Sequence, residues 1–181
     1  MCSLHVPERN SPCVKALLNK EEGCMGFDEL VEDLKKGTGL GRARAAAGLG
    51  KLRDKRASGI LTEALKDPHA GVRNNAAFAL GELDATEAVP HLIALLEDPE
   101  EWVRKSAAKA LGMLKATKAV IALELTTNDP SSVVRKNAIR SLGKIGGDIA
   151  VLALKRIASN REHAAAKLAL EALEKLEAGS H

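Results

Sequence analysis

The stretch VRNNAAFALGEL, residues 72–83, returns twice, as VRKSAAKALGML at 103–114 and as VRKNAIRSLGKI at 134–145. Each copy begins 31 residues after the previous one, and each is preceded at the same offset by an Asp-Pro pair. A fixed period of this length is the sequence signature of a helical repeat array. The chain of 181 residues is therefore expected to be a stack of similar units and not one globular core.

The spacing within a unit predicts two helices joined by a turn. Leucines recur at the period in the first half of each unit, and in three units a second leucine follows four residues later, as on a helical apolar face. The Asp-Pro pair then marks a turn, because proline has no N–H to donate and restricts the residue before it. The second half carries a small Ala for close helix approach and a Leu that fills the core. The repeated leucines are Leu30, Leu61, Leu92, Leu123 and Leu154.

Divergent copies lie at both ends of the array. A first copy survives around Arg42 and Leu49, although its Asp-Pro pair is missing. In a degenerate last copy, Ala166 and Glu174 stand at the positions of the motif's Arg and Gly. Terminal repeats diverge because one of their faces meets no further repeat. We therefore predict an all-α fold, an α-α superhelix of about five helix pairs with a period of 31 residues.

Composition and termini bound the class of protein. Hydrophobic residues make up 45% of the chain and aromatic residues only 2%, so the core is aliphatic. No apolar run is long enough to span a membrane, and the N-terminus has no signal-peptide pattern, so we expect a cytoplasmic protein. The predicted domains are a capping segment with one short helix at 1–26, the repeat array at 27–177, and a tail at 178–181 that resembles the remnant of an expression tag.

The motif Asp-Pro, Val-Arg and Ala-Ala-x-Ala-Leu-Gly-x-Leu resembles the short HEAT-like repeats named after the phycobilisome lyase family. The resemblance implies a helical solenoid but leaves function open, since this unit also builds adaptor scaffolds, lyase subunits, di-iron deoxyhypusine hydroxylases and DNA-repair glycosylases. The hydroxylases would require repeated His-Glu pairs as iron ligands. The only adjacent pair in this chain is Glu162-His163, reversed and unrepeated, so we expect no di-iron site, no other metal and no cofactor.

The repeated Asp and Arg of each unit admit a chemical and a structural interpretation. They could act as acid and base or hold a phosphate. The resemblance implies instead a ladder, in which each Arg joins Asp side chains or loop carbonyls along the stack. Recurrence in every unit and the bidentate geometry of Arg favour this structural role. The pairs are Asp67/Arg73, Asp98/Arg104 and Asp129/Arg135.

Two local motifs suggest ligands, but each has a simpler explanation. The N-terminal segment holds soft metal ligands, namely Cys2, Cys13, Cys24 and His5. They lack paired Cys-x-x-Cys spacing, and Ser11-Pro12 is typical of a helix start, so we favour a short capping helix over a zinc site. The segment Gly37–Arg42 is glycine-rich like a phosphate loop, but no strand precedes it and it stands where other repeats place their turn.

The second helices carry the predicted binding surface. In HEAT-like solenoids they line the concave face, so motif positions that do not repeat, including Ser106, are expected to point outward. These positions form a largely basic row, and exposed aromatic residues beside cations are typical of binding hot spots. The alternatives are that the cations only keep the face soluble, or that the aromatic residues pack between repeats. The predicted partner-binding residues are Asn74, Phe78, Trp102, Lys105, Lys109, Met113, Lys136, Arg140 and Lys144.

The uneven charge of the chain suggests the kind of partner. The formal net charge is only +3, yet the first helix of the array is acidic while this face is basic. We predict a non-enzymatic, monomeric scaffold that binds an acidic protein or peptide segment and no membrane. Nucleic acid is the alternative partner for the same face, although one Trp offers little base stacking. A lyase-like subunit is a third hypothesis, and no catalytic residues stand out.

Overall fold

The protein is a row of paired α-helices. The computed structural model describes residues 26–160 and 165–178, and these contain ten α-helices and no strand. The helices form five consecutive pairs, which confirms the predicted all-α repeat fold. The first helices of the pairs are α2 (Phe27–Lys36), α4 (Ser58–Ala64), α6 (Val89–Ala94), α8 (Val120–Thr126) and α10 (Gly147–Ser159). The second helices are α3 (Gly39–Leu52), α5 (Ala70–Glu82), α7 (Glu101–Met113), α9 (Ser132–Ile145) and α11 (Ala166–Ala178).

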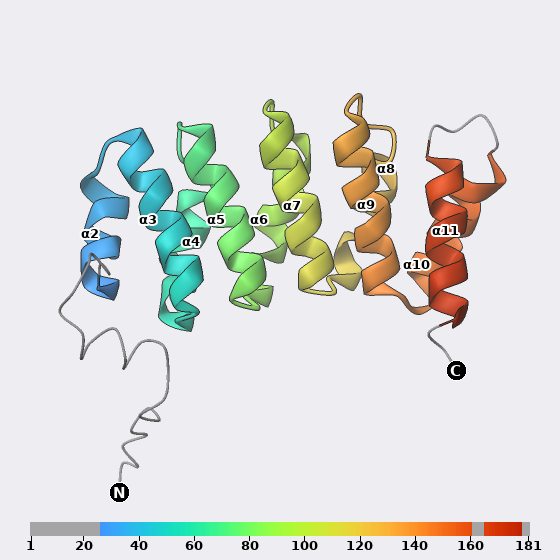
Figure 1. The fold of residues 1–181 in the computed structure, drawn as a ribbon, viewed down its shortest axis with the longest axis horizontal. Helices are drawn as coiled ribbons and strands as arrows, with labels where there is room; N and C mark the ends of the chain where they lie inside the picture. Colours follow the sequence, from blue (N-terminus) through green and yellow to red (C-terminus); the bar gives the residue numbers. More distant parts are fainter. Residues whose placement is uncertain (1–25, 161–164, 179–181) are drawn as a thin grey trace, which may run out of the picture.

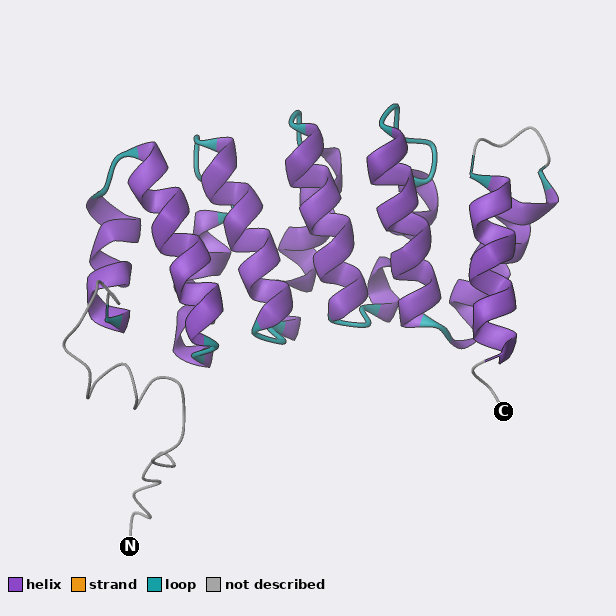
Figure 2. Ribbon diagram, in the orientation of Figure 1, coloured by secondary structure: helices purple, strands orange, loops and turns teal. Residues whose placement is uncertain are grey.

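The second helices stand side by side in chain order and make one face of the array (Figure 1). Behind them lie α4, α6, α8 and α10, while α2 packs beside α3 at the N-terminal end. The turns that join the helices lie along the two long edges of the row (Figure 2). We call the outer surface of α3, α5, α7, α9 and α11 the second-helix face.

Small residues let the central second helices approach one another closely. The repeated Ala of the motif is fully buried in each central unit, as is the Leu four residues later. A Cβ built on Gly50 would lie 2.7 Å from the Cβ of Ala79, and one built on Gly81 would lie 3.0 Å from the Cα of Ala110. The first distance is shorter than carbon atoms tolerate, so a side chain at Gly50 would displace its neighbour. The second is a tight contact, so a side chain at Gly81 would require α7 to shift by a few tenths of an ångström.

Arginines link each Asp-Pro turn to the next. Nε and Nη2 of Arg104 donate to the two carboxylate oxygens of Asp129 in the following repeat, at 2.7 and 3.1 Å. Nη1 of Arg104 donates to the backbone oxygen of Asp98 in its own turn, at 2.8 Å. The same bidentate bonds join Arg42 to Asp67 and Arg73 to Asp98. The predicted ladder is therefore confirmed, with each carboxylate paired to the Arg of the repeat before it.

Hydrogen bonding and burial act in opposite directions on the ladder carboxylates. The guanidinium of Arg42 holds the pKa of Asp67 below its ordinary value against the effect of burial. At Asp98 and Asp129 burial is the strongest influence and acts to raise the pKa, but bonds from arginine and from a backbone N–H together outweigh it. All three carboxylates therefore have a lowered pKa, which favours their charged form in the folded protein.

The glycine-rich segment near the start of the array serves as the turn of the first repeat. Thr38 caps α3 by accepting a hydrogen bond from the backbone N–H of Gly41, and Nη1 of Arg42 donates to the backbone oxygen of Gly37 at 3.0 Å. The predicted N-terminal cap and its three cysteines lie outside the described residues, as do residues 179–181 of the tail.

Candidate partner-binding face

The structure brings the predicted partner-binding residues onto the second-helix face. On each helix these residues are spaced by three or four positions, so they share one side of it. They are Asn74 and Phe78 on α5, Trp102, Lys105, Lys109 and Met113 on α7, and Lys136, Arg140 and Lys144 on α9. Contact between these residues and a partner stays a prediction.

Cations accumulate on this face from α7 onward. The basic patch consists of Lys105, Lys109, Lys136, Arg140, Lys144, Lys167 and Lys175. Lys105 is half-buried and the others are exposed. None of them forms an ion pair with another described residue. At the same repeat positions α3 and α5 carry one Lys, one Glu and otherwise neutral side chains, so positive charge rises toward the C-terminal end.

The two aromatic residues of the face have different surroundings. Phe78 on α5 is half-buried, and Nζ of Lys109 lies 4.4 Å from the centre of its ring, within range of a cation-π interaction. Trp102, in the first turn of α7, is 52% exposed. Trp102 therefore presents ring surface to solvent, whereas Phe78 is covered on one side by Lys109.

Met113, at the end of α7, contributes less surface than expected. The side chain is half-buried, and its sulfur would lie 3.3 Å from a Cβ built on Gly81 of α5. Met113 also lines a shallow hollow together with the charged residues Glu82 and Lys144. The thioether thus fills the space between two helices as well as reaching the surface.

The prediction that Ser106 points outward is wrong. Its side chain is buried, and its Oγ donates to Oδ1 of Asn74 across the interface of α5 and α7, at 2.7 Å. Asn74 donates in turn to Asn75, whose Nδ2 donates to the backbone oxygen of Ala43 on α3, also at 2.7 Å. Paired in this way, small polar groups can occupy the space between helices without a large desolvation penalty. The amide of Asn74 is thus already used within the array.

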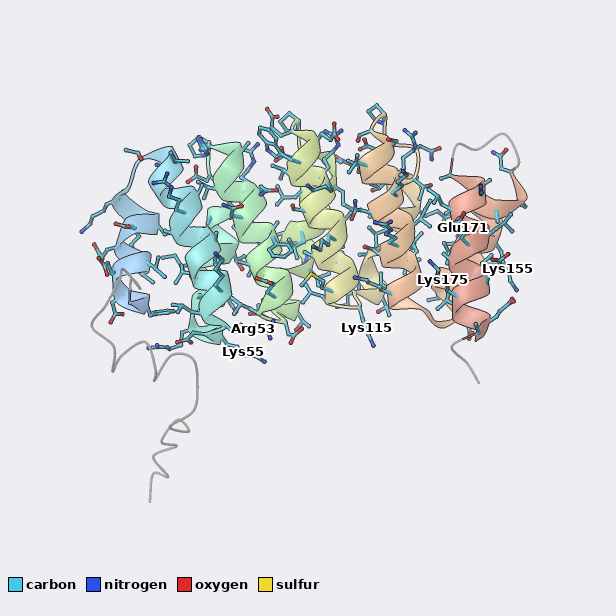
Figure 3. The ribbon with its side chains drawn as sticks, viewed as in Figure 1. Arg53, Lys55, Lys115, Lys155, Glu171 and Lys175 are labelled. Atoms are coloured by element: carbon cyan, nitrogen blue, oxygen red, sulfur yellow. The ribbon has the colours of Figure 1, made fainter. Side chains whose placement is uncertain are left out.

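A cleft opens in the face between α9 and α11. Its volume is about 360 Å³, and Figure 3 labels two of its lining residues, Glu171 and Lys175, on α11. Three predicted residues, Lys136, Arg140 and Lys144, line it from α9. The apolar lining consists of Ile139, Gly143, Leu168, Ala172 and Leu176.

The cleft exists because α9 and α11 do not pack as closely as the central helices. A Cβ built on Gly112 would lie 2.7 Å from the Cβ of Ser141 on α9. One built on Gly143, the equivalent glycine in the next repeat, would lie 3.7 Å from the nearest atom, the Cβ of Ala172, which is an ordinary contact. Space that the central interfaces exclude is therefore open at this end.

The Arg-Asp ladder also ends at this point. Arg135 donates to the backbone oxygens of Asp129 and Pro130 at 2.7 and 2.8 Å, as the other arginines do within their own turns. Asn160 stands at the position of the next Asp, and Ala166 at that of the next Arg. Within the described part of the chain Arg135 forms no ion pair, so the side chains that join the central repeats are not repeated at α11.

Two features of the surface escaped the sequence reasoning. The α11 side of the cleft lies in the degenerate repeat, where the motif no longer separates core from surface positions. On the first helices, Ile121 and Leu125 of α8 are 70% and 69% exposed. The equivalent residues one repeat earlier are Pro90 and Ala94. A comparison of these positions across the repeats would have shown that only α8 carries two large apolar residues there.

The described helices hold neither a cluster of metal ligands nor a membrane span. Across residues 26–160 and 165–178, no three His, Cys, Asp or Glu side chains are grouped so that they could hold a metal ion. In the same ranges no helix combines the length and apolar character needed to cross a membrane. The cysteines considered above for zinc lie outside these ranges.

Stacked helix pairs joined by one row of linked turns define an α-solenoid, a class of helical repeat protein. Within this class the chain belongs to the HEAT-repeat family, whose HEAT repeats model matches residues 27–112, 60–131 and 89–174. These overlapping matches cover most of the described array. No curated protein sequence is significantly similar to the chain.

Solved structures place the chain among natural and designed repeat proteins. One chain in the complex of CpcE and CpcF of phycocyanin lyase from Nostoc sp. PCC7120 is 28% identical to this chain, with a TM-score of 0.71. The match covers 86% of this chain and 68% of that chain. Human deoxyhypusine hydroxylase is 30% identical to this chain, with a TM-score of 0.56. The match covers 69% of this chain and 44% of the hydroxylase chain. A computationally designed armadillo repeat protein for modular peptide recognition is 22% identical, with a TM-score of 0.60, over 82% of this chain and 81% of the designed chain. At this identity the similarity concerns the fold only.

Proposed function

We propose that this HEAT-repeat protein is a non-enzymatic, monomeric scaffold of the cytoplasm that binds an acidic segment of a partner protein through the basic patch. The observation that carries the proposal is the absence of ion pairs between these cations and other described residues. The ladder arginines Arg42, Arg73 and Arg104, by contrast, are each paired with a carboxylate. Cations left available on neighbouring helices form a surface that complements negative charge.

The arrangement of the cations argues against a purely solubilising role. Lys136, Arg140 and Lys144 follow one another at four-residue spacing on α9, and like charges at this spacing destabilise a helix by about 0.2 to 0.5 kcal/mol per pair. A soluble surface is better served by interspersed charges of both signs. The exposed ring of Trp102 beside the patch adds the apolar contact that binding hot spots contain.

Other repeat proteins of this fold support peptide binding as the general activity. A designed armadillo repeat protein, 21% identical with a TM-score of 0.59, has been solved in complex with the peptide (KR)4. The peptide in that complex is basic. Because the second-helix face of this chain is itself basic from α7 onward, we infer that a segment bound here is acidic.

The likeness to the CpcE and CpcF complex favours a second candidate, a lyase-like subunit. That structure holds two different proteins, so a lyase-like role for this chain would require a second subunit. Nucleic acid remains the alternative ligand for the same cations, since phosphate contacts depend on positive charge and not on a specific pocket.

The test compares labelled probes on wild-type protein and on a variant with Lys105, Lys109, Lys136 and Arg140 all changed to Glu. We expect a glutamate-rich peptide to bind the wild type, and the variant to lose this binding while it keeps its helical fold, because none of these side chains belongs to the hydrophobic core. Loss of the contact between Lys109 and the Phe78 ring is expected to lower the melting temperature only slightly. Duplex and single-stranded nucleic acid are expected to give no shift at low salt. Tight, salt-sensitive binding of nucleic acid would instead favour the alternative. A variant that retains peptide binding would contradict the proposed role of the basic patch.

A further inference from the structure

We propose that the cleft between α9 and α11 is an anchoring site, in which a large apolar side chain of the acidic segment is buried while neighbouring carboxylates meet the rim. This inference rests on the proposed function and adds the chemistry of the ligand, an amphipathic acidic helix. The basic patch alone would accept any flexible acidic chain. The cleft would select among such chains for those that carry a leucine or an aromatic residue in helical register.

The floor of the cleft supplies the apolar half of the site. Ile139 is buried at its base, and Leu168, Ala172 and Leu176 of α11 are half-buried against the hydrophobic core. The volume of about 360 Å³ lies at the lower end of the range of small-ligand pockets, so the cleft has room for a large apolar side chain. Burial of an apolar side chain here would remove both its own surface and the floor from water.

The rim supplies the charged half of the site. Lys136, Arg140 and Lys144 stand along the α9 side and Lys175 along the α11 side, while Glu171 is the one acidic residue among the described lining residues. This excess of positive charge around an apolar floor repels a basic segment and attracts an acidic one. The partner must therefore combine carboxylates with an apolar anchor.

The spacing of the rim favours a helical ligand. The three cations of α9 are four residues apart, close to one helical turn, so they repeat at about 5 to 6 Å along the cleft. Carboxylates at four-residue spacing on a bound helix repeat at the same interval. Helices that bind in grooves use apolar anchors at related spacings, which places the anchor and the carboxylates on one side of the ligand.

The test fills the cleft without changing its charge. Gly143→Leu would project a side chain into the cleft, because a Cβ at Gly143 meets only Ala172, at 3.7 Å. Gly59→Leu is the matched control, since Gly59 lies on an exposed part of α4 with no atom near its added Cβ. The probes are two fluorescein-labelled peptides, one of Glu and Leu in amphipathic helical register and one in which Ala replaces every Leu, titrated by fluorescence polarisation.

We expect wild type to bind the Glu/Leu peptide more tightly than the Glu/Ala peptide. Gly143→Leu is expected to weaken the Glu/Leu peptide about tenfold, the loss that follows when one leucine-sized side chain is no longer buried. The same variant leaves the Glu/Ala peptide unchanged, and Gly59→Leu leaves both unchanged. Equal binding of the two peptides to wild type, or no effect of Gly143→Leu, overturns the anchoring site but leaves the acidic scaffold standing. If neither peptide binds wild type, the proposed function fails together with the inference.

Discussion

The interfaces in the middle of the array and the interface at its C-terminal end are built differently. Between α7 and α9, Gly112 packs directly onto Ser141, and Arg104 closes a bidentate bond with Asp129. Between α9 and α11 the equivalent glycine has room beside it, and the described residues include no further rung of the ladder. The same motif therefore produces a tightly packed helix interface between α7 and α9 and an open cleft between α9 and α11.

The comparison teaches how a repeat array separates stability from binding. Central repeats can close on both sides because each has a neighbour with matching residues. The last described repeat departs from the motif, with Ala166 and Glu174 at its Arg and Gly positions. Where the close glycine contacts and the Arg-Asp pairs end, the cations of α9 and the cleft between α9 and α11 lie on the surface. Three perturbations separate the two regions.

The largest effect is expected from breaking a central rung. Arg104→Ala would remove the bidentate partner of the nearly buried Asp129 carboxylate, which keeps only the backbone N–H of Ser131, and the donor to the carbonyl of Asp98. We expect this loss to lower the free energy of unfolding by about 2 to 3 kcal/mol. Arg135→Ala, which removes no ion pair among the described residues, is expected to cost about 1 kcal/mol or less. Urea denaturation followed by circular dichroism measures both. Equal losses would show that the ladder does not distinguish the two regions.

Substitutions at equivalent glycines are expected to have opposite signs. Gly112→Ala would push its Cβ to 2.7 Å from Ser141 and within 2.8 Å of that residue's Cα, so we expect a loss of about 1 to 3 kcal/mol in unfolding free energy. Gly143→Ala meets only an ordinary contact and gains helix propensity, so we expect a gain of about 0.5 to 1 kcal/mol. A thermal melt of each variant resolves the signs, and two losses of similar size would mean that α9 and α11 pack as tightly as the central helices.

A smaller effect is expected in how the stability contributed by Asp129 depends on pH. Because the pKa of Asp129 is lowered in the folded protein, its contribution to stability is present above the unfolded pKa of about 3.9 and is lost as pH falls through the lower folded pKa. Asp129→Asn is therefore expected to be less stable than wild type at pH 7, by a margin that shrinks below about pH 4. Asp148→Asn, on the exposed first turn of α10, serves as the control. A margin that stays constant down to pH 3 would contradict the role of the charged carboxylate.

Much of the fold could be predicted from the sequence, because each repeat restates the same local rules. The Asp-Pro pair, the buried Ala and the Leu recur at one period, so the helix pairs and the ladder followed from spacing and resemblance. Left-handed backbone at Arg53, Asp84 and Lys115, which follow α3, α5 and α7, could not be predicted, since only Asp84 among them is of a residue type enriched in that conformation. Tertiary packing imposes that conformation.

The candidate site could be predicted only in part. Its cations were found because they interrupt a repeated apolar pattern. The burial of Ser106 was missed because a small polar residue can either face water or bond to a neighbouring helix, and only the three-dimensional partner, Asn74, decides between them. The cleft depends on the distance between α9 and α11, which no single residue type encodes.

The central claim is that the C-terminal half of the second-helix face, and not positive charge in general, binds the acidic segment. It is tested by titrating the Glu/Leu peptide against two triple variants, Lys136, Arg140 and Lys144 to Glu, and Arg44, Lys51 and Arg53 to Glu. Each variant makes three reversals of two charges, which takes the formal net charge from +3 to −3. We predict that the first variant loses binding while the second stays within about twofold of wild type. Equal weakening in both variants would contradict the account.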